Sequence, residues 1–278
     1  MAEITAAAVG KLREMTNAGL MDCKKALVEA NGDLPAAVDI LRKKGVATAA
    51  KKAGREAKEG VIAQHILPGS RAGVLVEINC ETDFVAKNET FRSFCDDVAR
   101  RLAADPKADL ETDRVAAVAR IGENIKISRH QRLEVSGNGM VAAYIHTGAK
   151  LGVLVEVGAA KESTVGSDPF KELVRDITLQ IAAAHPIAVS RERMDPAIIA
   201  KEKEIAQEQV KNSPPQAVAK IVEGKLEKFF QTNCLLDQGF VKKEITVREH
   251  VAGVAKQLDD EISIRRFIRF QVGETTGA

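Results

Sequence analysis

The amino-acid sequence predicts an α+β protein, in which an N-terminal three-helix domain precedes a core of two repeated antiparallel-strand and helix units. The second unit is expected to carry an inserted antiparallel helical hairpin. Three observations lead to this prediction: apolar residues at helical spacing within the first 45 residues, two similar segments 79 residues apart, and a charged stretch inside the second repeat. The chain has 278 residues, 45% of them hydrophobic, and is long enough for a sizeable core.

The first two helices of the N-terminal domain are short. Residues 4–15 are expected to form the first helix, with Val9 and Leu12 on one face. The stretch TNAGLM interrupts this pattern. The second helix is expected to start at Asp22, whose side chain suits the N-cap, and to run to Ala30.

A stop signal separates the second helix from the third. Residues 31–32, Asn-Gly, tolerate the left-handed backbone that ends a helix, and Asp33 is placed to cap the next one. Val38 and Leu41 are three residues apart and mark its buried stripe. A basic linker, residues 43–60, is expected to follow.

An internal repeat predicts the architecture of the core. GVIAQHILPGSRAGVLVEI from Gly60 matches GMVAAYIHTGAKLGVLVEV from Gly139 without gaps, and IKISRHQRLEV from Ile125 resembles ISIRRFIRFQV from Ile262, 137 residues later. Each copy reads as two strands, two helices and a strand. The predicted domains are 1–54 for the N-terminal helices and linker, 55–138 for repeat 1, 139–186 with 230–278 for repeat 2, and 187–229 for the hairpin.

The insertion has the composition of two charged helices. Ile198 and Ile205 are seven residues apart, which indicates an apolar stripe, and Pro214-Pro215 cannot continue the first helix and so marks the reversal. Its exposed charges are typical of a solvated arm, or of an arm that meets a partner or a second copy of the chain. The sequence leaves both interpretations open, including a homodimer through the hairpin.

Composition and motifs exclude several classes of function. The net charge is only +2 and aromatics make up 4%, so no direct nucleic-acid binding is expected. The N-terminus lacks a secretory signal and no stretch suits a membrane span, which predicts a cytoplasmic protein without membrane contact. No phosphate-binding loop, metal-ligand spacing or nucleophile motif is present, so we expect no enzyme activity, cofactor or metal.

The stretch CETDFVAKN, residues 80–88, is unusual because an expected loop places Phe84 beside Asp83. At the repeat offset of 79, residues 82–85 align with Lys-Glu-Ser-Thr at 161–164, which has no aromatic residue. A purely structural demand of the fold should appear in both copies. We therefore expect Phe84 to serve a partner. His146, at an HTG turn, is either a surface turn residue or a partner contact.

Four stretches together resemble the bacterial elongation factor Ts family: TDFVAKN, MTNAGLMDCKKALVEANGDLPAAVDILRKKG, IGENI from Ile121 and FIRFQVG near the end. The resemblance covers nearly the whole chain. It implies a guanine-nucleotide exchange factor for elongation factor Tu, which the factor would bind in both the GDP-loaded and the nucleotide-free state. It also implies a ubiquitin-associated-like N-terminal domain, a two-part core, and a coiled-coil insertion that dimerises some members.

The resemblance further implies where the partner binds. Thr82, Asp83, Phe84 and Val85 would push toward the bound magnesium and phosphates of the GTPase. The implied docking residues are Arg13, Leu20, Met21, Lys24, Lys51, Lys52 and His146.

Two departures from the family pattern stand out. Leu20 stands where some members have Met, which keeps an apolar contact. Several members continue past the final strand with a further module, whereas this chain stops at residues 275–278. The N-terminal domain, the Phe84 loop and the core are therefore expected to carry the binding. The alternative function is an RNA- or ribosome-associated protein that uses Lys51-Lys52 and the SRHQR stretch at 128–132.

Overall fold

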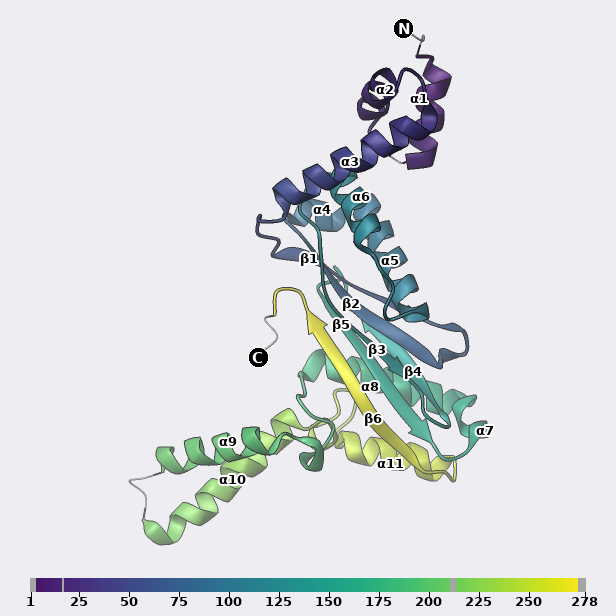
Figure 1. The fold of residues 1–278 in the computed structure, drawn as a ribbon. Helices are drawn as coiled ribbons and strands as arrows, with labels where there is room; N and C mark the ends of the chain where they lie inside the picture. The colour runs from purple at the N-terminus through teal and green to yellow at the C-terminus, as the bar shows by residue number, and fades with distance from the viewer. Residues whose placement is uncertain (1–3, 17, 211–213, 275–278) are drawn as a thin grey trace.

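The computed structural model describes residues 4–16, 18–210 and 214–274 (Figure 1). Within these ranges the protein has eleven α-helices and two three-stranded antiparallel sheets, so it is of mixed α+β class. The helices are α1 Ala6–Thr16, α2 Leu20–Glu29, α3 Leu34–Lys52, α4 Asp83–Lys87, α5 Glu89–Ala104, α6 Glu111–Ile121, α7 Glu162–Val165, α8 Asp168–Ala184, α9 Pro196–Gln209, α10 Pro215–Asn233 and α11 Val247–Gln257. The strands are β1 Glu59–Ile66, β2 Ala72–Cys80, β3 Lys126–Glu134, β4 Gly139–Ile145, β5 Leu151–Ala159 and β6 Ile262–Gln271.

The three N-terminal helices enclose a small core of their own. Its buried side chains are Val9, Leu12, Cys23, Ala26, Leu27 and Ala37, and the predicted Val38 and Leu41 pack at its edge. Helix α2 begins at Leu20 with Gly19 at the N-cap, so the prediction of a cap at Asp22 was wrong. Asp33 does occupy the N-cap of α3, although its side chain makes no capping hydrogen bond.

Helix α3 is longer than the sequence indicates. It continues to Lys52, so the prediction of a linker from residue 43 was wrong for most of that stretch. The reason is tertiary packing, because the last turns of α3 lie against α6. Gly45 is buried, and a Cβ there would be in ordinary van der Waals contact with Val115 at 3.6 Å and Ala119 at 3.7 Å, so α3 packs directly on α6 at this point.

The two sheets repeat one another. Their strand orders are β1-β2-β3 and β4-β5-β6, and each has a register shift at the same place in its central strand. Gly60 and Gly139 lie at the start of the first strand of each sheet, as its second and first residue, with φ +149° and +155°. A Cβ at these positions would lie 2.2 Å from the carbonyl oxygen of Ile78 and 2.5 Å from that of Val157, which only glycine avoids.

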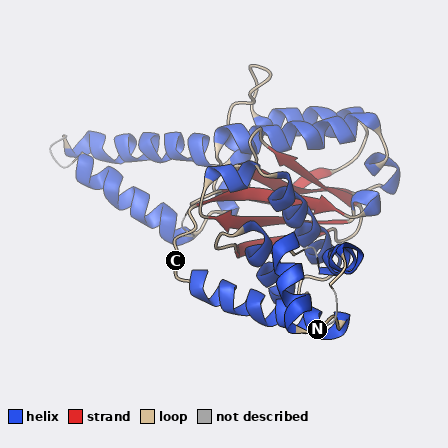
Figure 2. Ribbon diagram, turned by 90° about the horizontal axis from the view of Figure 1, so that it is seen from above, coloured by secondary structure: helices blue, strands red, loops and turns tan. Residues whose placement is uncertain are grey.

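The core has four layers, with the two sheets stacked between outer helices (Figures 1 and 2). Helices α5 and α6 cover the first sheet and α8 and α11 cover the second. The layer between the sheets is apolar and consists of Ile62, Leu75, Leu133, Val135, Val141, Leu154, Ile268 and Phe270. Strands β2 and β5 are buried on both faces, which explains their nearly continuous apolar sequence.

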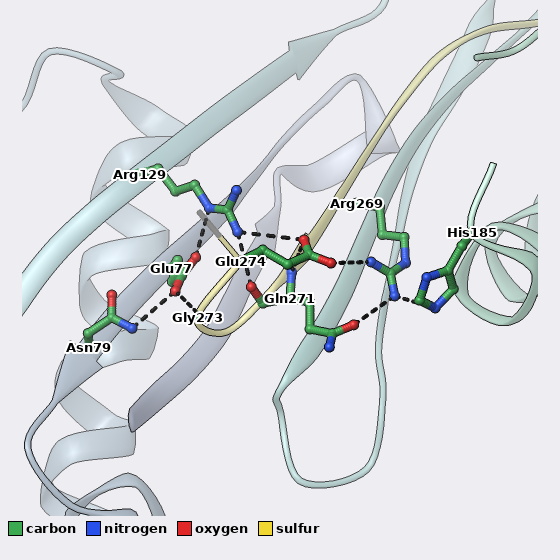
Figure 3. Close-up of polar contacts among 8 residues, drawn as sticks. All are labelled: Glu77, Asn79, Arg129, His185, Arg269, Gln271, Gly273 and Glu274. Carbon is green, nitrogen blue, oxygen red and sulfur yellow. Dashed lines mark hydrogen bonds and ion pairs between the residues drawn. The ribbon is translucent and has the colours of Figure 1, made fainter. Parts of the chain in front are cut away.

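A polar clasp joins the end of β6 to the first sheet (Figure 3). Glu77 of β2 is buried and accepts hydrogen bonds from Arg129 of β3 at 2.7 Å and from the Gly273 N–H at 3.1 Å. The Arg129 guanidinium also donates to the Gln271 carbonyl at 3.1 Å and lies over the Phe270 ring. The carboxylate is therefore fully engaged by groups from both repeats.

The second sheet holds the matching carboxylate. Glu156 is 2% exposed and receives hydrogen bonds from Arg265 at 3.0 Å and Arg266 at 2.7 Å. Burial alone would raise the pKa of Glu156. The hydrogen bonds from Arg266 and Arg265 outweigh burial and lower this pKa below its usual 4.5.

Helices α9 and α10 form an arm that extends from the second repeat (Figure 1). Its interior consists of Ala206, Val210 and Val222. Ile198 and Ile205 are about 40% exposed, so the predicted stripe faces outward instead of toward the other helix. The chain reverses between α9 and α10, where Pro215 occupies the first turn of α10 and residues 211–213 lie outside the described ranges.

The two ends of the arm meet at its base. The Ile187 N–H donates to the Asn233 carbonyl and the Leu235 N–H donates to the Ala188 carbonyl, both at 2.9 Å. Arg191 adds a bidentate ion pair with Glu227 at 2.6 Å. Across the described ranges, none of the helices has the length and apolar character needed to span a membrane.

Candidate functional site

The candidate site is the Phe84 turn, residues 82–87, which follows the buried central strand of the first sheet. The sequence predicts a loop here, but residues 83–87 form the single-turn helix α4. Thr82 caps this helix, because its hydroxyl accepts a hydrogen bond from the Val85 N–H at 3.3 Å. A short helix gives Phe84 a defined direction that an irregular loop would not.

The side chains of the turn divide into inward and outward groups. Ala86 is 3% exposed and Val85 packs at the edge of the first core, so these residues hold the turn on the body. Phe84 is 81% exposed, the largest fraction for any large apolar side chain in the described ranges. The ring therefore does not fold back into a local core and is available to a partner.

Asp83 places a negative charge beside this ring. Its carboxylate pairs with Lys87 one helical turn later, at 2.7 Å. The hydrogen bond from Lys87 lowers the pKa of Asp83 below its usual value, so Asp83 is ionised at neutral pH. The site thus combines an exposed aromatic ring with a half-exposed carboxylate.

A carboxylate from another part of the repeat supports the turn. Glu123 Oε2 accepts hydrogen bonds from the backbone N–H groups of Glu81 at 2.9 Å and Thr82 at 3.0 Å. Its Oε1 accepts the Thr82 hydroxyl at 2.6 Å. Sequence reasoning missed this residue, because Glu123 is 41 positions from Thr82 and no spacing rule connects them.

The implied docking residues lie in three places. Arg13, Leu20, Met21 and Lys24 are exposed on α1 and α2, with Leu20 at 53% and Met21 at 60%. These two apolar side chains are therefore not part of the core of the three-helix domain. Helices α1 and α2 lie at the opposite end of α3 from α4, so the structure does not bring this group to the Phe84 turn (Figure 1).

The other docking residues are nearer the first sheet. Lys51 and Lys52 form the last turn of α3, and Lys52 donates a hydrogen bond to the Gly122 carbonyl. His146 is exposed at the β4–β5 turn, where its Nδ1 lies 2.9 Å from the Tyr144 hydroxyl. That turn reaches the first repeat, because the Ala149 carbonyl accepts from the Ile62 N–H at 2.7 Å.

This surface is suited to binding a partner protein and not to making or breaking covalent bonds. Its side chains are an exposed ring, a carboxylate and lysines, and none is arranged as a nucleophile with a base. Among the residues whose placement is described, no group of three or more His, Cys, Asp or Glu side chains could hold a metal ion. The arrangement is suited to insertion of a short, rigid turn into another protein.

Comparison with known proteins identifies the family. The model of the family described as Elongation factor TS matches residues 81–274, more than half of the chain. The chain is 45% identical to Elongation factor Ts of Symbiobacterium thermophilum, an alignment that covers 99% of this chain and 93% of that protein. It is 40% identical to Elongation factor Ts of Lawsonia intracellularis, over 98% and 99% of the two chains. The chain therefore belongs to the elongation factor Ts family.

Proposed function

We propose that the chain is the guanine-nucleotide exchange factor of elongation factor Tu and that the Phe84 turn promotes release of GDP. Its family is one of elongation factors in protein biosynthesis, and the chain is not an enzyme. The observation that carries the proposal is the 81% exposure of Phe84 on a turn held by buried neighbours. We place this activity in the cytoplasm, where translation takes place.

The mechanism needs no bond to be broken. A GTPase holds its nucleotide through backbone N–H groups around the phosphates and through a bridging magnesium ion. An exchange factor has to bind the nucleotide-free conformation better than the loaded one, and each tenfold weakening of nucleotide binding needs about 1.4 kcal/mol of differential binding. Nucleotide then weakens the binding of the factor by the same ratio.

Phe84 supplies part of this differential binding when a pocket on the GTPase opens only in the distorted state. Full burial of a phenylalanine side chain contributes about 1.5–3 kcal/mol. The ionised Asp83 acts in one of two ways: it repels the adjacent phosphates, or it takes hydrogen bonds away from the magnesium site. Both need the carboxylate form, which Lys87 stabilises in the free protein.

The remaining affinity is assigned to docking. Leu20 and Met21 offer an exposed apolar contact, and Arg13, Lys24, Lys51, Lys52 and His146 complete the docking surface. We further propose that the outward Ile198 and Ile205 of the arm bring two copies of the chain together. This homodimer is independent of the exchange activity.

The RNA-binding alternative has weaker support. The SRHQR stretch lies on β3, where Arg129 is held by Glu77 and Arg132 donates to the Ala103 carbonyl at 2.8 Å. These arginines are thus engaged within the protein and do not form a free basic patch. Lys52 also has an internal partner, the Gly122 carbonyl.

The proposal is tested with purified elongation factor Tu loaded with fluorescent GDP. Stopped-flow mixing with this chain and excess unlabelled GDP should release the label faster than spontaneous dissociation. A pull-down should retain elongation factor Tu without GDP and lose it when GDP is in excess. Unchanged release, together with RNA binding that weakens steeply with salt, would favour the alternative.

A further inference from the structure

The segment after α6, residues 122–124, makes hydrogen bonds both to the end of α3 and to the residues that lead into the Phe84 turn. The Asn124 side-chain amide donates to the Arg55 carbonyl at 2.7 Å and to the Ala53 carbonyl at 3.3 Å, just after α3 ends. The Asn124 N–H donates to the Glu81 carboxylate at 2.6 Å, next to the Phe84 turn. This segment therefore connects the end of α3 with the start of α4.

Within this segment, Glu123 controls the cap of α4. The Thr82 hydroxyl has one hydrogen, which it donates to Glu123 Oε1 at 2.6 Å. That orientation leaves its lone pairs free to accept the Val85 N–H at 3.3 Å. Because Glu123 also receives the N–H groups of Glu81 and Thr82, one carboxylate fixes the backbone that enters the turn and the hydroxyl that caps it.

The second repeat provides an internal comparison. Asp260 aligns with Glu123 at the offset of 137 and accepts the N–H of Lys161, which aligns with Thr82, at 3.0 Å. An acid at this place therefore belongs to both repeats. However, α7 has no side-chain N-cap, because Lys161 has no hydroxyl, and Ser163 stands where the first repeat has Phe84. The hydroxyl-mediated cap and the exposed ring occur together in the first repeat.

We propose that Glu123 is a positioning residue for nucleotide exchange, which acts by holding the Phe84 turn in the direction needed to enter the GTPase. The inference rests on the proposed function. Glu123 does not need to contact the partner, since its carboxylate is satisfied by three donors of its own chain. Without these bonds Thr82 loses its orientation, α4 loses its cap, and the Phe84 ring samples other directions.

The test compares full-length Glu123→Ala and Glu123→Gln with Asp260→Ala as the matched control from the second repeat. The rate of GDP release is measured against factor concentration, which separates the maximal rate from the half-saturating concentration. Glu123→Ala should lower the maximal rate about tenfold, which is within the range that burial of Phe84 can supply. The half-saturating concentration should change much less, Glu123→Gln should recover part of the loss, and Asp260→Ala should keep the wild-type maximal rate.

A double variant separates positioning from general damage. In the Phe84→Ala background, Glu123→Ala should cause no further loss, because the ring that it positions is already absent. A full additional tenfold loss there, or an equal loss with Asp260→Ala, would overturn the proposal. If Glu123→Ala does not fold, Thr82→Val removes both hydrogen bonds of the hydroxyl, the one to Glu123 and the one from the Val85 N–H, and keeps the backbone bonds to Glu123. It should also lower the maximal rate, and a wild-type rate with Thr82→Val would overturn the proposal.

Hydrogen exchange distinguishes this inference from the proposed function. In the free protein, the amides of residues 83–87 should exchange faster in Glu123→Ala than in the wild type. If wild-type protein fails to accelerate GDP release at all, the proposed function fails, whether or not the amides change. If wild type is active and these amides keep their protection in Glu123→Ala, the positioning role fails alone.

Discussion

Replacing Phe84 with alanine should separate exchange from folding. The ring is 81% exposed, so its removal should change the free energy of unfolding by no more than about 0.5 kcal/mol. The same exposed fraction leaves about four fifths of the burial energy available to a partner, or about 1.2–2.4 kcal/mol. At 1.36 kcal/mol per power of ten, the maximal rate of GDP release should fall about 8- to 60-fold.

The assay is stopped-flow release of fluorescent GDP from elongation factor Tu, with thermal unfolding measured on the same samples. Phe91 is fully buried, so Phe91→Ala should lose about 3–5 kcal/mol of stability, which calibrates the effect of a core defect. Ser163→Ala, at the aligned position of the second repeat, should leave release unchanged. A folded Phe84→Ala protein with the wild-type maximal rate would refute the reasoning.

Four other predictions follow from exposure and charge. Leu20→Asp should weaken binding of elongation factor Tu with little change in melting temperature, because Leu20 is 53% exposed; melting of the domain with intact affinity would instead assign Leu20 to packing. Glu156→Ala should lower the free energy of unfolding in urea by about 1.5–3 kcal/mol, since it removes the charge-assisted hydrogen bonds from Arg265 and Arg266, which keep only their backbone carbonyl acceptors. The pKa of Glu156 is lowered in the folded protein, so its contribution to stability is present above the usual pKa of 4.5 and is lost as the pH falls through the folded-state pKa. Glu156→Gln should therefore flatten the acid side of the plot of unfolding free energy against pH, and an unchanged slope would contradict this. Ile198→Asp with Ile205→Asp should convert any dimer to a monomer in light scattering, and a wild type that is monomeric at high concentration would rule out the arm as a dimer contact.

The strands were more predictable than the packing of the helices. The gapless repeat shows the same strand pattern twice, which makes the prediction of the strands more secure. Gly60 and Gly139, for example, occupy the same left-handed backbone position in the two sheets. The length of α3 could not be predicted, because Gly45 normally weakens a helix and only its contact with α6 explains the continuation. The spacing of Ile198 and Ile205 indicated a stripe but not the side on which the second helix would pack.

The site was predictable in part for a similar reason. Phe84 was identified because an aromatic residue in a polar stretch departs from its aligned counterpart, Ser163. Glu123 lies in the IGENI stretch that carries the resemblance, but its role was missed because hydrogen bonds across 41 residues leave no local pattern. A weak signal was present, since Asp260 at the aligned position is also acidic. This pair of aligned acids could be interpreted only once the hydrogen-bond donors around the Glu123 carboxylate were known.

The closed base of the helical arm makes the insertion exchangeable. Since Ala188 and Leu235 are hydrogen-bonded neighbours, the chain leaves the core and re-enters it at almost the same point. The entropy of joining such ends grows slowly with length, by about 0.6 kcal/mol for each doubling of the loop. Longer, shorter or foreign segments could thus replace α9 and α10 as a side attachment, while the Phe84 turn on the other repeat keeps its shape.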